Sequence, residues 1–211
     1  MALDSAYFTP EEYRARTTKS DAGDDDTILA QGKAVARYLE QRLGRHFNQD
    51  AAPVTHLWRG SGRAHFWLPS EIATTTGLVV KVDLDGDFDF DAADETLTLN
   101  THFWVEPADA LTGPEPKPYQ YLAIVPNNGR LYHWPYWSHA VQVTATFGWP
   151  AVPGAIREAT ISVTRQLRDM QESGFTLTLQ SIDSVVNASP QMSALLLDME
   201  RQYARTSRWF V

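Results

Sequence analysis

Residues 141–159 have the sequence VQVTATFGWPAVPGAIREA, which contains the end of a strand and the start of a helix. The first seven residues alternate between apolar and mostly polar side chains, the pattern of a strand with one buried face. A glycine and two prolines then interrupt that pattern. Apolar side chains next recur at helical spacing, which predicts a helix from about Pro153 to about Glu172. A β-rich region therefore ends where a helical region begins.

Short strand patterns separated by turn residues fill the region before this junction. Gly60-Ser61-Gly62 is expected to close a hairpin, and Asp85-Gly86 and Asn127-Asn128-Gly129 indicate two further turns. Short strands at this spacing are typical of an antiparallel sandwich or a barrel-like sheet. About eight strands are predicted: Val54–Trp58, Ala64–Leu68, Gly77–Leu84, Glu95–Leu99, His102–Val105, Tyr121–Val125, Arg130–His133 and Ala140–Phe147.

Helical patterns precede the β-rich region. Thr9 and Pro10 are predicted to begin a short helix, as its N-cap and its first helical residue. A longer helix is predicted from about Asp25 to Leu43, with Gly44 ending it. The three aspartates at positions 24–26 are expected to accept hydrogen bonds from the first N–H groups of that helix.

A last helix completes the predicted organisation. Ser189-Pro190 is expected to open it, and its apolar stripe is Met192, Leu195, Leu196, Met199 and Tyr203. The predicted fold class is α+β: a small helical bundle, formed by the N-terminal helix and two C-terminal helices, with an inserted antiparallel β-sandwich or barrel-like domain. The expected parts, in chain order, are the first helical part, the insertion, the C-terminal helices and a tail: residues 1–50, 51–150, 151–203 and 204–211.

Composition and charge exclude several classes of protein. The chain has 211 residues, a formal net charge of -8 and no cysteine, so disulfides and thiolate metal sites are excluded. Acidity argues against sequence-independent DNA binding, which needs clustered Lys and Arg, but it suits a surface past which DNA moves. No apolar run approaches the ~20 residues of a membrane helix, and the first ten residues lack a signal-peptide pattern. The chain is therefore expected to be made and used in cytosol.

An acidic run has some features of a calcium-binding loop. It contains Asp83, Asp85, Asp87, Asp89 and Asp91. Such a loop needs glycine at its sixth position and an acidic residue at its twelfth, and neither possible register provides both. A turn with solvated carboxylates is therefore the favoured interpretation, and a metal-dependent hydrolase is the least favoured function.

The sequence contains no recognisable catalytic motif. Its six histidines do not stand at the HxH or HxxxH spacing of a local zinc pair, although His56 and His65 are placed to face each other across the first predicted hairpin. The GxSxG and GK[ST] patterns are absent. We predict no catalytic residue, no metal ligand and no cofactor, and the chain is not expected to be an enzyme.

Seven tryptophans leave a second function open. Most lie in the β-rich region, where they are expected to pack the sheet core and its edges. The cluster from Tyr132 to Trp137 is dense for a loop, so Trp134 and Trp137 are predicted to bind a partner. The alternative to a structural role is accordingly a β-sandwich module that binds a ligand such as a glycan on this Trp-rich surface.

The order of four passages resembles the head-to-tail connector, or head-completion adaptor, family of long-tailed bacteriophages. The variant that it resembles carries a β-domain inserted after the first helix, as in phages of actinobacteria. The fourth passage is the most specific of the four, and the resemblance spans about residues 7–205. The passages are Tyr13 with Asp24–Asp26 and the helix ending Leu43-Gly44-Arg45-His46-Phe47; Leu57–Gly62 before Leu68-Pro69; Val80–Asp87 with Phe103–Pro107; and Val141–Pro153 leading into Ile156, Arg157 and Ala159.

This resemblance implies a structural role in the virion, in the neck between head and tail. Family members form rings, usually dodecameric, that dock on the portal protein and contact a tail-side neck, stopper or tail terminator protein, while double-stranded DNA passes through the channel. The family has no catalytic residues and no membrane partner. Its portal contact tends to involve the C-terminal segment, which here corresponds to Arg201, Arg205, Arg208, Trp209 and Phe210.

Overall fold

The computed structural model divides the chain into two compact units. The β unit is Gln49–Ala151, and the helical unit is Ala2–Asn48 with Val152–Val211. The predicted insertion, residues 51–150, lies inside the β unit. Helices together with an antiparallel sheet confirm the α+β class. The residues that the structure describes are 6–17, 24–92, 94–172, 182–183 and 190–204.

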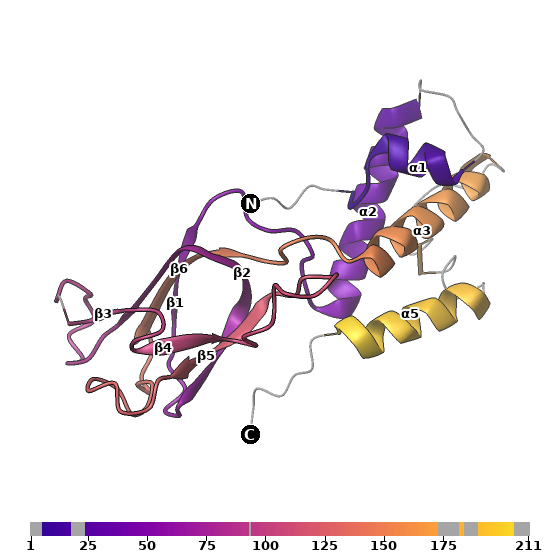
Figure 1. Ribbon diagram of the computed structural model, residues 1–211. Coiled ribbons are helices and arrows are strands. Elements are labelled where there is room, and N and C mark those ends of the chain that lie inside the picture. The colour runs from indigo at the N-terminus through magenta and orange to yellow at the C-terminus, as the bar shows by residue number, and fades with distance from the viewer. Residues whose placement is uncertain (1–5, 18–23, 93, 173–181, 184–189, 205–211) are drawn as a thin grey trace. The chain divides into compact units, whose positions relative to one another are not determined.

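Four helices lie in the described part of the helical unit (Figure 1): α1 (Pro10–Arg16), α2 (Asp25–Leu43), α3 (Gly154–Glu172) and α5 (Pro190–Tyr203). α2 packs against the other three, and α3 also packs against α5. None of these helices is long and apolar enough to span a membrane. The predicted N-cap of α5, Ser189, lies outside the described residues, as does the Met192 side chain.

The ends of the first two helices follow from their sequence. At α1, the Thr9 hydroxyl accepts from the Glu12 N–H at 3.2 Å and the Thr9 N–H donates to the Glu12 carboxylate at 2.9 Å, a reciprocal capping box with Pro10 at the first helical position. α2 ends at Gly44, whose φ of 64° is the left-handed conformation that glycine adopts most easily. These predicted ends are confirmed.

The carboxylate of Asp24 does not cap α2. Asp24 is the N-cap residue, but its side chain makes no hydrogen bond to the helix and instead pairs with Arg168 of α3. Arg14 of α1 pairs with Asp25 in the same region. The predicted capping role of this aspartate is therefore wrong, because a guanidinium ion from a neighbouring helix takes its oxygens. Asp24 and Asp25 therefore connect the start of α2 to α3 and α1.

The core of the helical unit contains both apolar side chains and a glycine. The apolar stripe of α2 is buried, with Val35, Ala36 and Leu39 at 0% exposure. Gly32 lies on the same helix, and a Cβ at that position would come within 2.6 Å of the Phe8 ring. Glycine is therefore required there by the close approach of the N-terminal segment, despite its cost inside a helix.

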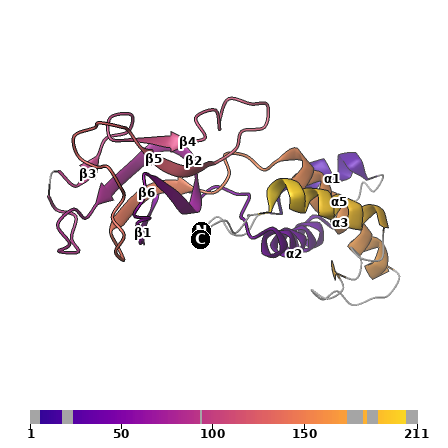
Figure 2. The same ribbon diagram turned by 90° about the horizontal axis from the view of Figure 1, so that it is seen from below.

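The β unit is one six-stranded sheet in the order β1-β6-β2-β5-β4, with β3 paired to β2 (Figure 2). All strand pairs are antiparallel. Backbone bonds also join the two ends of the unit, since the Asp50 N–H donates to the Phe147 carbonyl at 2.8 Å. The strands are β1 (Val54–Trp58), β2 (His65–Val82), β3 (Thr96–Leu97), β4 (Phe103–Glu106), β5 (Tyr119–Ile124) and β6 (Val141–Phe147).

Two predicted strands form one long, irregular strand. Ala64–Leu68 and Gly77–Leu84 belong to β2, which has register shifts between Trp67 and Ile72 and between Thr74 and Val79. Its first part pairs with β5 and its last part with β6 and β3. The predicted hairpin through Gly60-Ser61-Gly62 is therefore wrong, because β1 pairs with β6 and not with β2.

The same change of partners separates two histidines. The His56 ring packs against Trp58 and Phe147, with ring centroids 5.4 Å and 4.8 Å away. The His65 ring packs against Tyr121 on β5 instead. The prediction that these two histidines face each other across a hairpin is therefore wrong, because the hairpin itself does not form.

The predicted strand at Arg130–His133 is also wrong. Hydrogen bonds to the Asn128 side chain take the place of strand pairing there. The carboxamide oxygen of Asn128 accepts from the N–H groups of Arg130 and Leu131 at 2.7 Å and 2.9 Å. Its nitrogen donates to the carbonyls of His102, Val125 and Leu131. One asparagine thus satisfies the backbone groups that a strand would have paired.

Candidate functional site

Trp134, one of the predicted partner-binding residues, lies in the core of the β unit. Its side chain is 1% exposed, its ring centroid is 5.6 Å from that of Phe66, and its indole N–H donates to the Ala64 carbonyl at 3.2 Å. A partner cannot reach this ring in the folded chain. The role of Trp134 in the folded β unit is therefore to hold the surrounding loop.

The loop around Trp134 presents two tyrosines to solvent. Tyr132 is 73% exposed and Tyr136 is 69% exposed, while Trp137 is half-buried with its indole N–H donating to Asp83 at 3.1 Å. Gly60 holds the loop closely, since a Cβ there would overlap the Pro135 carbonyl oxygen at 1.8 Å. The exposed side chains of this loop are therefore Tyr132, His133 and Tyr136, which lie next to the predicted tryptophans.

The C-terminal residues predicted to bind the portal fall mostly outside the described part of the chain. Arg201 lies on α5 and is exposed, and Leu195 and Leu197 of the same helix are 37% and 51% exposed. Leu196, Met199 and Tyr203 are buried. α5 therefore buries part of its apolar stripe and leaves two leucines and a cation exposed. Arg205, Arg208, Trp209 and Phe210 lie outside the described residues.

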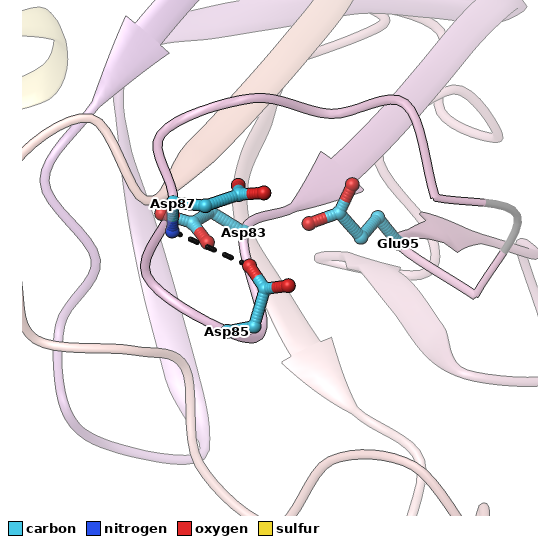
Figure 3. Close-up of side chains that lie close together, drawn as sticks. All are labelled: Asp83, Asp85, Asp87 and Glu95. Carbon is cyan, nitrogen blue, oxygen red and sulfur yellow. Dashed lines mark hydrogen bonds between the residues drawn. The ribbon is translucent and has the colours of Figure 1, made fainter.

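An acidic cluster lies in the loop that joins β2 to β3. Asp83, Asp85, Asp87 and Glu95 each bring a carboxylate oxygen within 4.8 Å of the others (Figure 3). Oxygen ligands of this kind suit a calcium or magnesium ion. The sequence prediction missed Glu95 as a member of the cluster, because β3 returns it beside Asp83 from outside the acidic run.

Hydrogen bonds inside the loop account for this cluster. Buried Asp83 accepts from the Gly86 N–H at 2.7 Å, and buried Glu95 accepts from the N–H groups of Leu84 and Ala92 at 3.4 Å and 3.1 Å. Asp85, Asp87 and Asp89 each accept from the N–H two residues further on. The carboxylates therefore order a turn-rich loop, as the favoured interpretation expected. Asp83 is not solvated as that interpretation expected, because it is buried and accepts from Gly86 and Trp137.

We expect Asp83→Asn to lower the free energy of unfolding by about 1–2 kcal/mol, because one buried acceptor becomes a donor beside the Gly86 or Trp137 N–H. Exposed Asp87→Asn is the matched control and should change it by less than about 0.5 kcal/mol. Urea unfolding in EDTA and in excess calcium chloride measures both. A calcium-dependent rise in the wild-type midpoint that Asp83→Asn abolishes would contradict the purely structural role.

A buried polar network surrounds Glu40 near the end of α2. The Tyr7 hydroxyl donates to this carboxylate, and the Arg37 guanidinium and the His46 imidazole lie 2.7 Å and 3.3 Å from it. Burial alone would raise the pKa of Glu40, but the bonds from His46, Tyr7 and Arg37 outweigh it and hold the pKa below its usual value. Burial and the bond to Glu40 raise the pKa of Tyr7.

A cleft of about 490 Å³ adjoins this network and is lined by Arg37, Glu40, Gln41, Gly44, Arg45 and His46. The Tyr7 hydroxyl also accepts from the Phe47 N–H at 3.1 Å, and the Phe47 ring lies against that of Tyr203. The N-terminal segment, α2 and α5 therefore meet at this point. The network serves the folding of the helical unit.

Four aromatic side chains, three of them exposed and Tyr121 half-buried, gather on the outer face of the sheet. His65 and Trp67 on β2, Tyr121 on β5 and Trp104 on β4 form this group, which we call the aromatic face. Trp67 and Trp104 are 41% and 40% exposed. The sequence prediction placed such tryptophans in the core or at its edges, because His65–Leu68 is apolar or aromatic at every position and only strand register shows which side is buried.

Comparison with protein-family models and with curated protein sequences finds no match. Among solved structures, the chain is similar to a chain of "Neck of empty GTA particle computed with C6 symmetry". The two chains have 16% sequence identity and a TM-score of 0.52, and the similarity covers 94% of this chain and 91% of the other. This similarity shows a shared fold that extends over both the helical unit and the β unit.

Proposed function

We propose that this chain is a structural subunit of the neck of a tailed phage or phage-like particle, where it connects head and tail. The similarity of fold over 94% of the chain to a neck protein of a GTA (gene transfer agent) particle carries this proposal. The order of the four sequence passages supports it independently. No catalytic role is proposed, and the subunit acts in the virion after synthesis in the host cytoplasm.

The proposed assembly is a ring of identical subunits. A closed ring needs two different, complementary faces on every copy. The neck structure of the neighbour was computed with C6 symmetry. A dodecameric ring, which the family resemblance implies, contains a sixfold axis. The proposed partners are the portal protein on the head side and a neck, stopper or tail terminator protein on the tail side, with double-stranded DNA in the channel.

The distribution of charge fits a subunit that DNA passes without binding. The β unit has twelve Asp and Glu residues and five Lys and Arg residues, a net charge of -7 of the chain's -8. Like charges repel the phosphate backbone, and binding to DNA depends on clustered cations. The β unit is therefore proposed to have no direct role in holding DNA.

The portal contact is proposed to involve exposed Arg201 and the segment that contains Arg205, Arg208, Trp209 and Phe210. Arginine and tryptophan are the residues most enriched among interface anchors. Losing one anchor typically costs about 2 kcal/mol or more, a factor of about thirty in affinity.

In a particle-producing strain that lacks its own copy of the gene, the wild-type chain should restore joined particles. A chain that ends at Tyr203 should leave separate heads and tails, because its portal affinity falls by about thirtyfold or more. Electron microscopy of purified particles and portal pull-down measure both effects. The full-length chain with Thr206→Ser is the matched control and should join particles normally. Fully joined particles from the truncated chain would disprove the portal contact of the C-terminal segment. Joined particles formed without any copy of this chain would disprove the neck role.

A further inference from the structure

The aromatic face extends over three adjacent strands. The register pairs Trp104 with Ala123 and Ala123 with His65, and it pairs Glu106 with Tyr121 and Tyr121 with Trp67. Residues directly opposite one another in antiparallel strands lie on the same side of the sheet. The alternate residues Phe66, Leu122 and Phe103 are buried in the core. The aromatic face is therefore the side of the sheet turned away from that core.

Ring contacts order the aromatic face. The Tyr121 ring centroid is 4.5 Å from that of Trp67 and 5.6 Å from that of His65. Ala123, which pairs with His65 and with Trp104, is buried, while the side chains of these two neighbours are exposed. Rings held in this way lose little conformational entropy when a partner covers them, which is one reason that aromatic residues are favoured in interfaces.

A cleft of about 530 Å³ begins at Trp104. Its lining also includes Thr75, Asn100, Val105, Glu106 and Tyr119. Anchor residues of protein interfaces commonly fill such concave sites beside an exposed aromatic side chain. The aromatic face and this cleft together offer a flat area and a recess to one partner.

Low charge suits the aromatic face for contact between copies. With a net charge of -7, β units repel each other wherever their carboxylates meet. On the outer side of the paired segments of β2, β5 and β4, the only carboxylate is Glu106. A second acidic copy can therefore approach the aromatic face with little electrostatic repulsion.

We propose that the aromatic face, with the cleft at Trp104, is the surface on which a second copy of this chain docks in the assembled neck. This inference rests on the proposed function, because a ring places copies side by side. The contact is heterologous: the aromatic face of one copy meets a different surface of the next, as ring closure requires.

Photocross-linking in assembled particles tests which molecule covers this surface. The photoreactive residue p-benzoylphenylalanine replaces Trp104 on β4 in one chain and Phe88, which is 65% exposed in the loop between β2 and β3, in the control chain. We expect irradiation to give a product of two copies of this chain from position 104 and to give less of it from position 88. If the residue at position 104 cross-links to another protein, or gives no cross-linked product in joined particles, the proposal is overturned. If the wild-type chain is absent from joined particles, the neck function itself has failed.

Substitution tests whether the contact matters for assembly. The variant with Trp67→Ala and Trp104→Ala should retain its melting midpoint but leave at least about thirtyfold less chain on purified heads, since two anchors are lost. Leu57→Ala with Phe88→Ala, which truncates two exposed side chains elsewhere in the β unit, is the matched control and should assemble like the wild type. Normal assembly of the variant with Trp67→Ala and Trp104→Ala overturns the proposal. Normal assembly combined with weaker attachment to host cells would show that the surface binds a glycan instead.

Discussion

Replacing Trp134 by alanine is expected to lower the free energy of unfolding by about 3–5 kcal/mol. The side chain is 1% exposed and among the largest that are fully buried, so its removal leaves a cavity in the β unit. It also leaves the Ala64 carbonyl without the indole N–H that lies 3.2 Å away. Urea unfolding followed by circular dichroism measures the loss.

Tyr132→Ala is the control for this experiment. Tyr132 lies in the same loop and is 73% exposed, so its truncation should change the free energy of unfolding by less than about 0.5 kcal/mol. A loss for Trp134→Ala no larger than that of the control would contradict the core position. Trp134→Ala is expected to weaken partner binding because less of the β unit is folded. The partner-binding role proposed for this loop is therefore better tested at half-buried Trp137.

Tyr7→Phe is expected to lower the free energy of unfolding by about 1–3 kcal/mol at neutral pH. The hydroxyl donates to buried Glu40 and accepts from the Phe47 N–H at 3.1 Å. Its loss leaves a buried carboxylate with one donor fewer and a backbone N–H without its acceptor. Tyr132→Phe, which removes an exposed hydroxyl, is the control and should have little effect.

The cost of Tyr7→Phe should depend on pH in a direction that the pKa shifts determine. Because the pKa of Tyr7 is raised in the folded chain, its contribution to stability is complete below the unfolded value, about pH 10, and is lost as the pH rises further. The difference between wild type and Tyr7→Phe should therefore shrink above about pH 10. A difference in the free energy of unfolding that grows above about pH 10 would contradict the raised pKa of Tyr7 in the folded chain.

Glu40 should act in the opposite sense. Because the pKa of Glu40 is lowered in the folded chain, its contribution to the free energy of unfolding is complete above the ordinary pKa of 4.5. This contribution is lost as the pH falls through the pKa of the folded state. Acid unfolding of Glu40→Gln should consequently show a weaker dependence on pH than that of the wild type. The same urea titrations, repeated below about pH 4.5, measure it.

Helix boundaries were predictable because local chemistry decides them. The capping box of Thr9 and Glu12 and the left-handed Gly44 involve residues within one helical turn. The role of Asp24 was not predictable in this way, since its partner Arg168 is far away in the sequence. Short-range signals thus located the helix ends but could not assign a side chain that a distant residue engages.

Strand pairing was harder, because it depends on partners that are distant in the sequence. Gly60-Ser61-Gly62 has the composition of a hairpin turn, yet β1 pairs with β6. The sequence around Pro69 and Gly77 looks like two strand ends, while the chain continues as one strand through register shifts. The aromatic face depends on that register, so no local pattern identified it.

The β unit begins and ends at one place in its own structure. The backbone bond from Asp50 to Phe147 and the ladder between β1 and β6 bring the two ends of the unit together. A module with adjoining ends can be gained, lost or exchanged by recombination without stretching the chain that it interrupts. Relatives of this chain are therefore expected to vary most in the β unit, while the helical unit persists.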